Sequence, residues 1–145
     1  YVEALRSAAS AAGADDRLQL VGHVDDPQRY YGPVDIAVNS CVGAEPFGIS
    51  VVEAMMMAEP VLVHAKGGPA ETVVDGETGW HVPEPTVDTF AHAIREALKV
   101  RHDWPTLGAN ARQRALNNFT TETFRAGYAQ IASRLVSQAK ESNHG

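Results

Sequence analysis

Short apolar runs alternate with helical patterns through the first half of the chain. Each run is bounded by glycine, proline or a polar residue, as short buried strands are. These runs predict four strands, at residues 18–22, 35–40, 60–65 and 79–83. Near-continuous apolar strands separated by helices are typical of a parallel sheet covered on both faces, so we predict an α/β fold.

Apolar residues at helical spacing predict the helices before, between and after these strands. Four such segments lie in the first half of the chain, at residues 5–13, 26–32, 49–58 and 70–74. Beyond Pro85 the pattern is wholly helical, with apolar stripes at residues 87–98, 107–119 and 124–135. The last stripe follows Thr120-Thr121-Glu122, which offers a hydroxyl cap and an acidic first turn.

The composition narrows the class of protein. The chain has 145 residues, enough for one domain that buries roughly 70% of its unfolded surface. A net charge of −6 without a Lys/Arg stripe argues against nucleic acid as a partner. The single cysteine, Cys41, excludes an internal disulfide and favours a reducing compartment. No apolar run reaches membrane-spanning length, and residues 1–10 read as a helix instead of a signal peptide, as in a piece of a longer protein.

Candidate chemistry lies in the loops that follow the predicted strands, because ligands of open α/β sheets bind at the carboxyl ends of strands. Gly48 precedes a predicted helix, whose first N–H groups have no intrahelical partner and whose dipole is positive there. A phosphate would be favoured at that point. Gly67-Gly68, before Pro69, offers a second such helix start.

Two carboxylates stand near the first of these helix starts, and the residues alone allow two interpretations. In one, Ser50 is an N-cap, Glu53 reaches back to complete a capping box, and Ile49 packs on Ala54. In the other, Glu45 and Glu53 together bind neighbouring hydroxyls of a sugar or a ribose. A metal fits less well, since no His or Asp falls at ligand spacing nearby.

The segment "EPFGISVVEAM", followed by "PVLVHAKGGPAETVVDGETGWHVPEP", resembles the donor-binding half of the retaining glycosyltransferases of family 4, which have the GT-B fold. The Glu-x7-Glu pair and the spaced "GGPAE" and "DGETG" elements carry the resemblance. Residues 17–41 are similar to the preceding family segment, so the likeness covers nearly the whole chain. It implies a Rossmann-like domain over residues 1–145 that lacks its first strands and the N-terminal acceptor domain.

The resemblance also implies roles for individual residues. Glu45 would contact hydroxyls of the donor sugar, and Glu53 would contact the nucleotide ribose. Backbone amides of four consecutive residues would meet the sugar and the diphosphate: Phe47, Gly48, Ile49 and Ser50. His23 and Val24 would lie by the nucleobase, mostly through their backbone groups, and the Gly67-Gly68 pair would complete the donor site.

The family's chemistry sets further expectations. It implies no cofactor, no essential metal and no protein nucleophile, because the leaving phosphate helps to deprotonate the acceptor on the same face of the sugar. The expected partners are a nucleoside diphosphate sugar, an unknown acceptor (a sugar, a lipid or a small molecule) and the rest of the parent enzyme. The expected location is cytoplasmic or peripheral to the inner face of a membrane.

One departure from the family limits what this chain can do alone. The family carries an upstream Gly-Arg…Lys segment whose cations neutralise the diphosphate, and nothing in this chain matches it. Lys66 is a tempting substitute but is expected to be a solvated loop lysine. We therefore expect this chain not to catalyse sugar transfer by itself.

Two other functions remain alternatives at this point. The chain could be a nucleotide-sugar-binding or assembly module without catalysis, which the missing cations favour. It could also be a glycoside hydrolase that uses Glu45 and Glu53 as its carboxylate pair. Outside the site, we expect His64 and His81 to be hydrogen-bonded core histidines and Cys41 to be a small buried residue.

Overall fold

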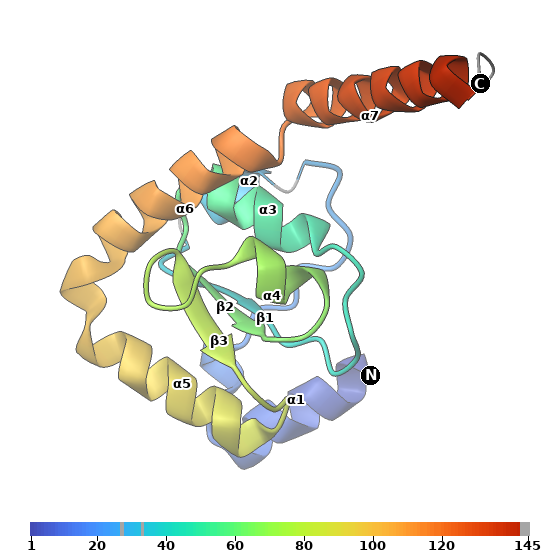
Figure 1. Cartoon of the computed structure of the whole chain (residues 1–145). Coiled ribbons are helices and arrows are strands. Elements are labelled where there is room, and N and C mark those ends of the chain that lie inside the picture. The colour runs from blue at the N-terminus through green and yellow to red at the C-terminus, as the bar shows by residue number, and fades with distance from the viewer. Residues whose placement is uncertain (27, 33, 143–145) are drawn as a thin grey trace.

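A parallel sheet forms the centre of the domain (Figure 1). The computed structural model describes residues 1–26, 28–32 and 34–142, and in them the sheet has three strands in the order β1-β2-β3. They are β1 (Ala37–Asn39), β2 (Val61–His64) and β3 (Gly79–Val82). Val61 is in register with Ala37 on one side and Gly79 on the other. The predicted α/β class with a parallel sheet is confirmed.

Helices occupy the connections and the C-terminal part of the chain. They are α1 (Val2–Ala11), α2 (Gln28–Tyr31), α3 (Ile49–Met56), α4 (Gly68–Thr72), α5 (Val87–Lys99), α6 (Trp104–Asn118) and α7 (Thr121–Ser142). Short 3₁₀ turns cover Asp15–Arg17 and Arg101–Asp103. Every helical segment expected from the sequence is present, with bounds shifted by a few residues. Pro27, within the expected turn at 26–32, lies outside the described residues.

The predicted strand at 18–22 is wrong. Leu18 has extended backbone angles (φ −99°, ψ 114°), but no strand in the described residues pairs with this segment. Its apolar side chains are consequently exposed, at 37% for both Leu18 and Leu20 and 46% for Val21. A strand forms when a neighbour bonds its N–H and C=O groups, so an apolar run without a partner in the sheet stays irregular.

The core lies between β2, α3 and α6. Its buried apolar residues are Val51, Ala54, Met55, Val61, Val63, Val73, Ala111 and Ala115. All four residues of β2 are buried, so both faces of the central strand are covered. The helices approach closely where Gly108 of α6 meets the end of α3, since a Cβ on Gly108 would lie 1.9 Å from the Ala58 carbonyl oxygen.

Helix α7 projects away from the rest of the domain (Figure 1). The expected helix is confirmed, and Thr120 Oγ1 accepts a hydrogen bond from the Thr123 amide at 3.1 Å, as the predicted cap requires. Its apolar stripe does not join the core, however. The exposed residues of this stripe are Phe124, Tyr128, Ile131 and Leu135, with exposures between 60% and 72%.

The contact at Gly108 gives a test of the packing between α3 and α6. Gly108→Ala would force a methyl group into the Ala58 carbonyl and should lower the free energy of unfolding by roughly 1–3 kcal/mol. Gly127→Ala is the matched control, because this helical glycine in α7 has open space around it and alanine is the better helix former. Urea unfolding measures both, and an equal effect of the two substitutions would contradict the packing argument.

A buried carboxylate lies where the chain leaves α3 for β2. Glu59 is only 7% exposed. Burial raises the pKa of Glu59 above its ordinary value, and the nearby charge of Asp35 raises it further. Folding therefore favours the protonated form of Glu59, and this contribution to stability is lost as the pH rises through the folded-state pKa.

It follows that ionised Glu59 destabilises the protein at neutral pH. We expect Glu59→Gln to raise the melting temperature at pH 7, and this advantage to shrink as the pH falls through the raised folded-state pKa of Glu59 toward the ordinary value of 4.5. Thermal unfolding between pH 4 and pH 8 measures the effect, with the exposed Glu77→Gln as control. A difference in melting temperature between the Glu59→Gln variant and the unchanged chain that does not vary with pH would refute this account of Glu59.

Candidate functional site

Two loops that follow adjacent strands are joined through their backbones. The Gly68 amide donates a hydrogen bond to the Glu45 carbonyl at 2.8 Å, and Glu45 and Gly67 form an isolated parallel bridge. A Cβ on Gly67 would lie 2.3 Å from the Glu45 carbonyl oxygen, and one on Gly68 would lie 2.5 Å from Phe47 Cα. The two glycines are thus required by the close approach, and they seat loop 43–48 against the start of α4.

Helix α3 begins directly after this contact, at a glycine in the left-handed conformation. Gly48 is the N-cap (φ 84°, ψ 58°), and its carbonyl accepts from the Val51 and Val52 amides at 3.0 and 3.1 Å. Glycine adopts these angles without the steric cost that a Cβ brings. The amides of Ile49 and Ser50 therefore lie in the first turn, where N–H groups have no intrahelical acceptor and can meet an anion.

The capping-box interpretation of Glu53 is wrong. Ser50 is the second residue of α3 instead of its N-cap, and the cap makes no side-chain hydrogen bond. Ile49 is 67% exposed, so it is not packed against the helix as that interpretation required. The reason is that Gly48 starts the helix two residues earlier than the Ser-x-x-Glu pattern suggests. Glu53 is left without a capping role.

The carboxylates flank this helix start. Glu45 lies in the loop before it and Glu53 in the second turn of α3, and both are partly exposed. Tyr31, from α2, reaches the same helix: its hydroxyl donates to the Ser50 carbonyl at 3.2 Å. Burial raises the pKa of Tyr31, and the charge of Glu53 and a hydrogen bond to it raise that pKa further. Sequence reasoning missed Tyr31, whose only signal was an aromatic residue in a short helical turn.

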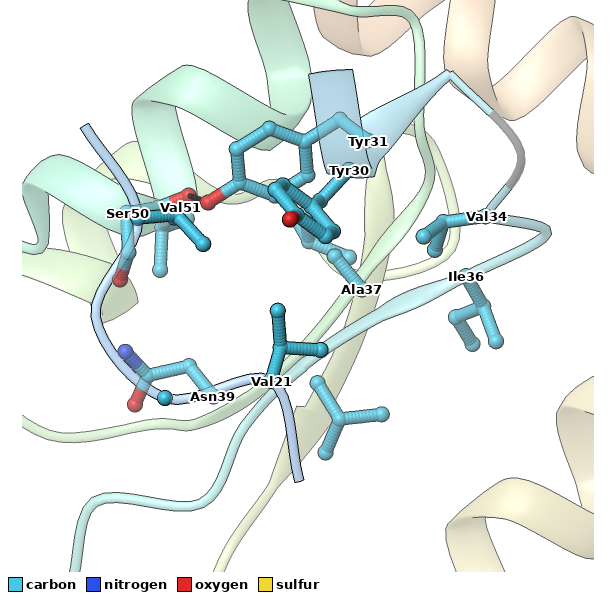
Figure 2. Close-up of a pocket in the computed structure, with 13 residues that line it drawn as sticks. Val21, Tyr30, Tyr31, Val34, Ile36, Ala37, Asn39, Ser50 and Val51 are labelled. Atoms are coloured by element: carbon cyan, nitrogen blue, oxygen red, sulfur yellow. Dashed lines mark hydrogen bonds between the residues drawn. The ribbon is translucent and has the colours of Figure 1, made fainter. Parts of the chain in front are cut away.

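A cavity of about 410 Å³ opens beside the first turn of α3 (Figure 2). Mostly apolar residues line it: Val21, Gly22, Val24, Tyr30, Tyr31, Val34, Ile36, Ala37, Val38, Asn39, Ser50, Val51 and Val61. The structure thus brings Val24 to the same cavity as Ser50. It does not bring the side chain of His23 there, because that side chain is 90% exposed and its Nε2 lies 3.5 Å from Asp25 Oδ1.

Two histidines near the strand ends are hydrogen-bonded, as expected, but Cys41 is not buried as expected, and His81 is only partly buried. His64, at the end of β2, is buried, and its Nδ1 donates to the Cys41 carbonyl at 3.0 Å. His81 Nε2 donates to the Val73 carbonyl at 3.0 Å. Cys41 itself is only partly buried. Lys66 is exposed, in agreement with a loop lysine.

Within the described part of the chain, no group of three or more His, Cys, Asp or Glu side chains is arranged to hold a metal ion. The same residues include no helix with the length and apolar character needed to cross a membrane.

Comparison with known proteins identifies the family. The model of the family described as "Glycosyl transferases group 1" matches residues 1–114. Since this match covers well over half of the 145 residues, the chain belongs to the group 1 glycosyl transferase family. The resemblance inferred from the Glu-x7-Glu segment is thereby confirmed at the level of the family.

Individual relatives agree with this assignment. The chain is 29% identical over 140 residues to the alpha-1,3/1,6-mannosyltransferase ALG2 of Dictyostelium discoideum, covering 93% of this chain and 32% of the relative. Among solved structures, HepE of Anabaena in complex with UDP matches with a TM-score of 0.85 at 25% identity, over 92% of this chain and 37% of that one. Sucrose-phosphate synthase from Thermosynechococcus elongatus matches with a TM-score of 0.82 at 30% identity, over 94% of this chain and 34% of that one.

These proteins have the GT-B fold, as the sequence predicted for this chain. The chain spans about a third of the length of these three proteins.

The contact between the two loops can be tested by comparing two glycines with the same φ. Gly67 and Gly76 both have φ +75°, so alanine is strained at either position, but only at Gly67 does a Cβ meet backbone. Gly67→Ala should therefore lower the free energy of unfolding by roughly 1–3 kcal/mol more than Gly76→Ala. Urea unfolding measures the difference, and equal losses would show that loop 43–48 does not rest on Gly67.

Proposed function

We propose that this chain binds a nucleoside diphosphate sugar, as the donor-binding part of a glycosyltransferase that retains anomeric configuration and needs no metal. The observation that carries the proposal is the start of α3 at Gly48, with Glu45 in the loop before it and Glu53 one turn after it. Backbone amides that can bind a phosphate, and carboxylates that can bind hydroxyl groups, lie within one loop and the helix that follows it.

Each part of the ligand has a group suited to it. The diphosphate would meet the backbone amides of residues 47–50, in the positive end of the α3 dipole. Glu45 would accept hydrogen bonds from hydroxyls of the sugar, and Glu53 from those of the ribose. The base would lie near Val24, at the apolar cavity. The Gly67-Gly68 pair would act through the backbone, by seating the loop that carries Glu45.

The family supports this reading of the ligand. HepE of Anabaena, 25% identical to this chain, has been solved with UDP and also with UDP-glucose. Several relatives are named mannosyltransferases. The acceptor and the nucleotide base are left open, and the cytoplasmic or peripheral location stays an expectation from the sequence.

The reaction proposed for the parent protein is a transfer on one face of the sugar. The bond between the sugar C1 and the leaving phosphate oxygen breaks, a bond from C1 to the acceptor oxygen forms, and the leaving phosphate takes the acceptor's proton. This route needs no protein nucleophile. Glu45 would orient the sugar, and the amides at the start of α3 would stabilise the negative charge that develops on the departing diphosphate.

A binding module without catalysis is the second candidate. Residues 40–58, which include the start of α3, contain no Lys or Arg. This segment therefore offers the diphosphate backbone dipoles but no cationic side chain, which favours binding over turnover for this chain alone. The glycoside hydrolase alternative receives no support from the family match.

Calorimetric titration with UDP, GDP and ADP tests the proposal. We expect one of them to bind, and Glu53→Gln to weaken that binding by roughly 1–3 kcal/mol through loss of charge-assisted hydrogen bonds to the ribose. Glu45→Gln should leave this affinity unchanged but weaken binding of the matching nucleotide sugar. Excess EDTA should have no effect on either ligand.

Glu77→Gln, on an exposed turn, serves as the control and should bind like the unchanged chain. Lack of binding by all three nucleotides to the folded chain would defeat the proposal for this chain. Equal affinity of the Glu53→Gln variant would defeat the assigned role of Glu53.

A further inference from the structure

Tyr31 connects the short helix α2 to the first turns of α3. Its ring packs against the hydrophobic core, where it is partly buried. Its hydroxyl reaches the Ser50 carbonyl at 3.2 Å, and Figure 2 shows the ring directed from α2 toward Ser50. The neighbouring Tyr30, by contrast, is 46% exposed. The position of the Tyr31 hydroxyl is therefore set by the packing of its ring.

The hydroxyl lies on the side of α3 that carries Glu53. Residues three apart on a helix share a face, so a group above the Ser50 carbonyl is close to the side chain of Glu53. After burial, the charge of Glu53 and a hydrogen bond to it raise the pKa of Tyr31, in agreement with this arrangement. The single hydroxyl proton can therefore be donated either to the Ser50 carbonyl or to the Glu53 carboxylate, and the charged carboxylate is the stronger acceptor. No Lys or Arg occurs in residues 40–58, the sequence neighbours of Glu53.

A glutamate that binds a ligand loses rotamer freedom when it does so, and this loss weakens binding. A neighbouring donor held in place by the core reduces that cost, because the carboxylate is oriented before the ligand arrives. We propose that Tyr31 is a positioning residue, whose hydroxyl holds the Glu53 carboxylate in the orientation that accepts the hydroxyls of a ribose. This inference rests on the proposed function, since it deepens the role given there to Glu53.

The first test compares a nucleoside diphosphate with its 2′,3′-dideoxy analogue, for whichever of UDP, GDP or ADP binds. Tyr31→Phe keeps the ring and removes only the hydroxyl. It should weaken binding of the ribonucleotide by about threefold to tenfold and leave the affinity for the dideoxy analogue unchanged. Tyr1→Phe, at a residue 95% exposed, is the control and should change neither affinity.

A purely structural role would weaken both ligands to the same extent, and that result would overturn the inference. Failure of the proposed function looks different. If the Glu53→Gln variant prefers the ribonucleotide over the dideoxy analogue as strongly as the unchanged chain does, Glu53 does not contact the ribose, whatever Tyr31 does.

The second test needs no ligand. Urea unfolding of Tyr31→Phe, Glu53→Gln and the double variant forms a double-mutant cycle. If the Tyr31 hydroxyl holds the Glu53 carboxylate, the effects on the unfolding equilibrium constant should depart from additivity by at least about twofold. Additive effects would overturn the inference even if the nucleotide binds. Non-additive effects without nucleotide binding would support the contact and count against the ribose role.

Discussion

The close backbone approach between loop 43–48 and the Gly67-Gly68 pair is the constraint on which the candidate site depends. The loop follows β1 and the glycines follow β2, so the contact brings the ends of two adjacent strands together. A side chain on either glycine would overlap the backbone of Glu45 or Phe47. With the loop seated in this way, Gly48 can start α3 at the sheet edge, where parallel α/β folds bind ligands.

The start of α3 brings together groups that suit different kinds of ligand atoms. Its first-turn amides suit an anion, while Glu45 and Glu53 suit hydroxyl groups. Tyr31 adds a donor that is anchored in the core instead of in a loop. Because these groups come from one loop and two helices, the binding proposed here depends on the packing of α2 and α3 as much as on the identity of the carboxylates.

Much of the candidate site was predictable because it is local in sequence. The residues from Glu45 to Glu53 lie on one loop and the helix that follows, so their order alone places them together. Contacts between distant segments were not predictable in this way. Tyr31 lies 19 residues before Ser50, to which it bonds. The start of α3 at Ile49 was predicted, but the Ser-x-x-Glu pattern suggested Ser50 as the N-cap, and a glycine with positive φ at position 48 takes that role instead.

The sequence by itself determined the class of fold, the helices and the β1, β2 and β3 strands, since these follow from periodicity and from glycine and proline positions. Only the tertiary structure decided which apolar segments find partners. Residues 18–22 have a strand pattern and α7 an apolar stripe, yet in the described chain the first is unpaired and the second exposed. The pattern of apolar and polar residues shows whether a segment is able to pair or pack. Hydrogen bonds between strands and burial of a helix face also require a second surface.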